Sequence, residues 1–143
     1  MSGLALVTGR LAPGVWRGGS MPRTELTNLA RGLGWIVHEG QISAVEDKAT
    51  YLDELGAIAG VPDYVRPNWD SMADGLRDTG ITTPRLLVIQ TNRPTPFDAT
   101  AIEILDEAVG FWAVHDAIMQ VAWFGPVEAP DLDQVNPDKR SRR

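Results

Sequence analysis

Acidic side chains recur at helical spacing in the middle of this chain. Between Pro62 and Asp78 a short loop leads into a predicted helix, on which Asp70, Asp74 and Asp78 follow one another every four residues. Residues four apart share a face of a helix, and like charges there repel by a few tenths of a kcal/mol. The pattern indicates a surface for a basic partner, and a solvated helix face accounts for the same spacing. Asp70 and Asp74 together are also candidates for acid–base catalysis or for a magnesium site.

The net charge of the protein is concentrated around this segment. The chain carries 19 acidic and 13 basic residues, which gives a net charge of −6. Residues 39–78 contain nine of the acids and three of the bases, whereas the rest of the chain has ten of each. Nucleic acids are held through Lys and Arg contacts to phosphate, so this balance argues against a nucleic-acid partner. A basic protein is the expected partner.

Motifs for other chemistries are missing from the sequence. The chain has no cysteine, which excludes disulfides and thiolate metal ligands. It has no glycine-rich phosphate loop and no nucleophile elbow, and His38 and His115 are not at zinc-ligand spacing. No neighbouring nucleophile, pocket signal or second metal-binding cluster in the sequence supports a catalytic or metal site at Asp70 and Asp74. We therefore predict no enzyme activity, no cofactor and no metal site.

The size and the first residues of the chain define its general class. A chain of 143 residues, 43% of them hydrophobic, suits one domain with one core. The first residues lack a basic segment, and their apolar run is too short for a signal peptide or a membrane span. We expect a cytoplasmic protein with no membrane partner.

Helices and strands alternate along the predicted framework. Predicted helices run from Pro22 to Leu33 with Ser20 as N-cap, from the capping box Ser43–Glu46 to Gly60, from the N-cap Asn68 to Gly80, and from Thr95 past Trp112; predicted strands are Trp35–His38, Leu86–Gln90 and Ile118–Phe124. Strands joined by helical crossovers favour a parallel sheet. The predicted fold class is α/β, with a small three-stranded parallel sheet packed with helices.

The chain is divided into three parts by composition. Residues 1–33 are expected to form a glycine- and proline-rich N-terminal arm, with room for a short strand, followed by an extra helix. Residues 34–125 are expected to form the α/β domain. Residues 126–143 combine prolines, scattered acids and a basic end, which predicts a flexible C-terminal tail.

The acidic segment and its surroundings resemble the barstar family of intracellular ribonuclease inhibitors. The resemblance rests on a helix with Tyr51, Leu52 and Leu55, on Pro62-Asp63-Tyr64, on Asn68-Trp69-Asp70, and on Asp74 with Leu76. It extends over about residues 35–124, since the later strand, helix and strand follow the family order. The resemblance implies a barstar-like fold and a monomer that occludes the basic active site of a small secreted ribonuclease, of the barnase or guanyl-specific type, in a 1:1 complex.

The resemblance also implies roles for individual residues. Asp74 corresponds to the helix aspartate that enters the phosphate site of the enzyme, and Asp70 to the acid one turn earlier. Tyr64 corresponds to the loop aromatic near the enzyme's catalytic histidine, and Asn68 to the asparagine that begins the helix. Glu107 is the candidate for a further acid from the later helix. The predicted partner-binding residues are Asp63, Tyr64, Arg66, Asn68, Asp70, Ala73, Asp74 and Asp78.

Three positions depart from the family pattern. Ala73 replaces a helix tryptophan of the best-known member, and Arg66 with Pro67 replaces a glycine and an acid in the loop. These changes remove an aromatic contact, stiffen the loop and add a positive charge, so we expect a ribonuclease other than barnase. Arg66 could repel a basic enzyme or pair with Asp63 or Asp70. The alternative function is an interaction module that binds a basic protein which is not a ribonuclease.

Overall fold

Four parallel strands form the central sheet of the computed structural model, which describes residues 2–44 and 46–134. The strands are β1 (Val15–Arg17), β2 (Ile36–Gln41), β3 (Arg85–Gln90) and β4 (Met119–Phe124), in the spatial order β1-β4-β3-β2. β3 and β4 lie in the centre and are buried along most of their length, as a continuous apolar run predicts. The prediction of a three-stranded sheet is wrong, since β1 adds a fourth strand. The sequence did not reveal β1, because a strand of three residues is too short to show a pattern.

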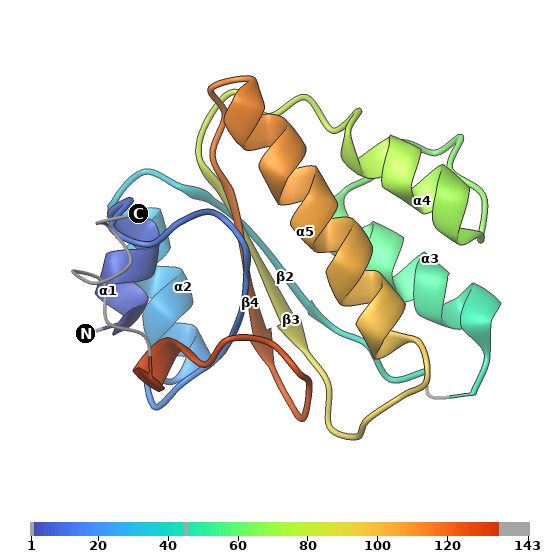
Figure 1. Ribbon diagram of the computed structural model, residues 1–143, viewed down its shortest axis with the longest axis horizontal. Helices are drawn as coiled ribbons and strands as arrows, with labels where there is room; N and C mark the ends of the chain where they lie inside the picture. The colour runs from blue at the N-terminus through green and yellow to red at the C-terminus, as the bar shows by residue number, and fades with distance from the viewer. Residues whose placement is uncertain (1, 45, 135–143) are drawn as a thin grey trace.

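Helices cover both faces of this sheet (Figure 1). One face carries α3 (Lys48–Ala59), α4 (Trp69–Leu76) and α5 (Asp98–Val114); the other carries α1 (Ser2–Val7) and α2 (Arg23–Gly32), with a 3₁₀ helix, η1 (Leu132–Gln134), on the same side. Successive side chains of a strand point to opposite faces. Leu87 and Ile89 of β3 therefore pack with α3 and α5, whereas Leu86 and Val88 pack with α1 and α2. No helix within the described residues is both long and apolar enough to cross a bilayer.

The N-terminal extension is an integral part of the fold. Residues 2–7 were expected in an irregular arm but form helix α1. The sequence did not predict this helix, because so short an apolar run does not distinguish a helix from a strand. In β1 the Trp16 side chain is 1% exposed, and its ring nitrogen donates to the Gln120 side-chain oxygen at 3.2 Å. The same oxygen accepts from the Gly14 backbone N–H at 2.9 Å. The buried Gln120 thus holds β1 against β4.

The segment that follows β4 also packs against the extension. Residues 126–134 contradict the flexible tail predicted from residue 126, since Leu132 is buried in the core beside α1 and α2. A salt bridge of 2.7 Å joins Arg17 of β1 to Asp131. The sequence pattern did not predict that this segment packs on the fold, because Leu132 and Asp131 contact residues about a hundred or more positions earlier in the chain. The rest of the predicted tail, residues 135–143, lies outside the described residues.

Three helix starts differ from the prediction, and one of them is α5, which begins at Asp98 and not at Thr95. The N-cap of α3 is Asp47, whose carboxylate accepts from the Ala49 backbone N–H, and the expected capping box does not form. Ser43 instead donates to the carboxylate of Glu54, an acid within α3 that reaches back to the preceding loop. Ser20 does not cap α2 but donates to Asp133 of η1. In both cases the serine hydroxyl donates to a carboxylate of a later element instead of accepting from the first turn of the predicted helix.

We predict that His38 makes the fold less stable in mild acid. Its Nδ1 lies 3.2 Å from the Ile58 carbonyl oxygen, and partial burial, followed by the nearby Arg85 charge, lowers the pKa of His38 below 6.5. The unfolded chain then binds a proton at a pH where the folded protein does not. Stability should therefore fall as the pH decreases from about 6.5. Urea denaturation at pH 7.5 and 5.5 measures the free energy of unfolding at each pH. His38→Gln should reduce the difference between the two values. If the variant leaves that difference unchanged, other groups cause the pH dependence.

Candidate functional site

The loop of residues 61–67 and helix α4 form the candidate site. Asn68 has extended backbone geometry, and its side-chain oxygen accepts from the Ser71 backbone N–H at 2.8 Å. The prediction of Asn68 as N-cap is thereby confirmed. The Ser71 hydroxyl oxygen in turn accepts from the Arg66 backbone N–H at 2.7 Å. These two hydrogen bonds fix the end of the loop to the first turn of α4.

Packing also holds the loop against the helix. Met72, Gly75 and Leu76 are buried on the inner side of α4. A Cβ atom on Gly75 would collide with the Val65 side chain, so the glycine allows the loop to lie directly on the helix. In addition, the Trp112 ring nitrogen donates to the Leu76 carbonyl oxygen at 3.0 Å, which ties the end of α4 to α5. Loop and helix therefore present their outer side chains on one supported surface.

The acidic side chains of α4 lie on the outside, as predicted. Asp70 and Asp74 of α4 are exposed. Asp78 is also exposed, but it lies in the turn after the helix, because α4 ends at Leu76 and not near Gly80 as predicted. The side chain of Asp74 is 78% exposed, and its nearest cation is the Arg77 guanidinium at 3.8 Å. An exposed pair at this distance contributes little to stability. The Asp74 carboxylate is thus available to a partner at small cost to the fold.

Tyr64 joins the loop to the turn after α4, where Asp78 lies. Its side chain is 58% exposed, and its hydroxyl donates to the carboxylate of Asp78. This hydrogen bond is the main cause that raises the pKa of Tyr64, and the negative charges of Asp78 and Asp74 contribute in the same direction. Three residues that the sequence predicted for one surface, Tyr64, Asp74 and Asp78, therefore form one cluster.

The remaining predicted residues contribute in different ways. Arg66 is exposed and forms no ion pair with Asp63 or Asp70, so its positive charge remains on the acidic surface. Ala73 is half-buried and packs against the core, which leaves no large side chain at that place on the helix. Glu107 is exposed on α5.

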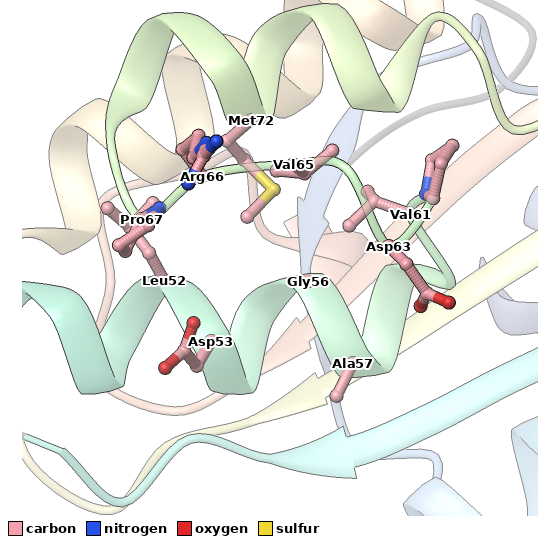
Figure 2. A pocket seen from close by; sticks show the side chains of 11 residues that line it. Leu52, Asp53, Gly56, Ala57, Val61, Asp63, Val65, Arg66, Pro67 and Met72 are labelled. Atoms are coloured by element: carbon pink, nitrogen blue, oxygen red, sulfur yellow. The ribbon is translucent and has the colours of Figure 1, made fainter.

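One acidic residue near the loop was not predicted. Asp53 is exposed on α3 and lines a pocket together with Asp63 and Arg66 (Figure 2). Helical spacing shows that Asp53 lies outside the buried face of α3. Sequence pattern does not show that this part of α3 faces the loop, since that depends on how the two helices pack.

The other chemistry considered for the acids lacks support in the geometry. Within residues 2–44 and 46–134 there is no group of three or more His, Asp or Glu side chains placed to hold a metal ion. Asp70 and Asp74 therefore belong to no such group in this part of the chain.

We predict that Asn68→Ala destabilises the protein by about 1 kcal/mol, because the first turn of α4 loses its side-chain acceptor. The urea midpoint at pH 7.5 measures the change. Asn68→Ser is the matched control, since serine also accepts from the backbone and should keep most of the stability. Equal destabilisation by both variants would contradict a capping role.

A comparison with known families agrees with this geometry. The family model described as Barstar (barnase inhibitor) matches residues 35–123, a range that includes the loop and α4 but none of α1, β1 and α2. No curated protein and no solved structure is significantly similar to the chain. Because the family match covers more than half of the 143 residues, this chain belongs to the barstar family.

Proposed function

We propose that this protein inhibits a small basic ribonuclease by covering its active site with the loop of residues 61–67 and helix α4. The observation that carries the proposal is the exposed Asp74 carboxylate beside Tyr64 and Asp78 on a supported surface. The family match, which names a ribonuclease inhibitor, supports the same function. We further propose that the complex contains one copy of each protein, that it forms in the cytoplasm, and that the inhibitor catalyses no reaction.

Electrostatics explain why such a surface suits a ribonuclease. An enzyme that cleaves RNA must bind phosphate, so its active site contains cationic side chains. A carboxylate on a fixed helix can replace a phosphate and accept charge-assisted hydrogen bonds from those side chains. The surplus of acidic residues in 39–78 should also attract a basic enzyme at long range, which raises the association rate at low salt.

A titration of ribonuclease activity tests the proposal. A panel of small guanyl-specific ribonucleases, each cleaving a fluorogenic RNA, is titrated with the protein at low and at physiological salt. Stoichiometric loss of cleavage for at least one enzyme, with faster association at low salt, is the expected result. Salt-sensitive binding that leaves RNA cleavage intact would instead support an interaction module for another basic protein.

A further inference from the structure

A pocket opens beneath the loop of the candidate site, between α3 and α4 (Figure 2). Its volume is about 190 Å³. The apolar residues that line it include Leu52 and Gly56 of α3, Val61 of the loop, and Met72 of α4. This volume exceeds what a single water needs and is smaller than the roughly 300–1,000 Å³ of small-molecule sites. The pocket therefore has the size for one side chain of a partner.

Gly56 of α3 leaves room for the pocket, because it has no side chain. A Cβ atom on Gly56 would lie 3.1 Å from a Val61 methyl carbon and 3.2 Å from the terminal carbon of Met72. The glycine thus permits close approach of the loop to α3, and any larger residue would narrow the space. Asp53 and Asp63 lie on α3 and on the loop, at different places around the opening (Figure 2).

Both carboxylates are available to a ligand. Asp53 and Asp63 are exposed, and within the described residues neither side chain accepts a hydrogen bond or forms an ion pair. Arg66 is the one basic residue among those that line the pocket, so acids outnumber bases there by two to one. A lining that combines apolar side chains such as Leu52 and Met72 with two exposed carboxylates matches a side chain with an aliphatic stem and a cationic end. Lysine and arginine have this chemistry.

We propose that the pocket receives a lysine or arginine side chain of the inhibited ribonuclease, with its stem against Leu52 and Met72 and its charge beside Asp53 and Asp63. The proposal rests on the proposed function, and it adds α3 to the surface formed by the loop and α4. A buried cationic anchor in a pocket is a common source of binding energy at interfaces, particularly when it is arginine. The enzyme then meets acids on both sides of the loop.

Charge variants of Asp53 test the pocket in the complex. For a ribonuclease that the protein inhibits, Asp53→Asn should weaken binding about five- to tenfold and Asp53→Lys by more, since the new lysine competes for the pocket. The matched controls are Glu25→Gln and Glu25→Lys, because Glu25 is exposed on α2, across the sheet from the pocket. These controls make the same charge changes and measure the long-range effect alone. Equal effects at both positions would overturn the pocket proposal.

A small cation tests the pocket without any ribonuclease. Backbone amide NMR signals are followed during titration with Nα-acetyl-lysine methylamide, and with the norleucine compound as a control that has an aliphatic stem but no charge. Saturable shifts at Gly56 and Asp63 with the lysine compound alone, lost in Asp53→Asn, are expected. Shifts that are absent, or equal for both compounds, would overturn the proposal.

The two tests separate the two proposals. If Asp74→Ala abolishes inhibition while the Asp53 variants behave as their Glu25 controls, the inhibitor function stands and the pocket proposal fails. If no ribonuclease is inhibited and the lysine compound still binds beside Asp53, the ribonuclease function fails and the pocket remains a site for a cationic side chain of another protein.

Discussion

Asp74→Ala is expected to weaken inhibition of a susceptible ribonuclease at least tenfold, about 1.4 kcal/mol of binding free energy. The carboxylate is 78% exposed and has its nearest cation at 3.8 Å, so binding breaks little within the inhibitor. Its removal leaves cationic groups of the enzyme without the acceptor that replaced phosphate, and such groups are costly to bury unpaired. The measurement is the inhibition constant from RNA cleavage at fixed salt.

Two further variants show whether the effect arises at this position. Asp74→Asn keeps the size of the side chain and removes its charge, so it should lose most of the same affinity. Glu25→Gln removes one acid from α2, across the sheet, and should change the constant little. All three variants should unfold within about 0.5 kcal/mol of the original protein, because they are surface substitutions. An inhibition constant unaffected by Asp74→Ala would remove Asp74 from the binding surface.

Trp16→Ala is expected to cost about 3–5 kcal/mol of folding stability, the largest effect that we predict on the fold. Trp16 is 1% exposed, packs in the core beside α1 and α2, and donates a hydrogen bond to Gln120. Alanine leaves a cavity there and removes one donor to the buried Gln120 oxygen. The free energy of unfolding of folded proteins is typically about 5–15 kcal/mol, so this substitution should remove a substantial part of it. Urea denaturation followed by circular dichroism measures the loss.

The Trp16 variants also test whether the N-terminal extension is part of one cooperative unit. Trp16→Phe retains an aromatic ring and should lose less stability than Trp16→Ala. Below its unfolding transition, Trp16→Ala should inhibit as the original protein does, because α4 lies on the opposite face of the sheet. A urea midpoint equal to that of the original protein would show that β1 contributes little to the fold, despite its pairing with β4.

Helices and strands with strong local patterns were predictable from the sequence. Five residues of α3 at the spacing of one helix face are all buried: Tyr51, Leu52, Leu55, Ile58 and Ala59. The apolar strand β3, the N-cap Asn68 and the exposed acids of α4 also agree with the prediction. Each depends on hydrophobic periodicity or on a hydrogen bond between near neighbours, which short segments of sequence contain.

The sequence by itself therefore determined the order of most elements, the acidic face of α4 and the family. The tertiary structure decided the fourth strand, since three residues become β1 only by pairing with β4. It also decided that Tyr64 reaches Asp78, and that Asp53 of α3 shares a pocket with Asp63 of the loop. The physical reason is the same in each case: these contacts join separate elements, and only the packing of helices and strands on one sheet brings them together.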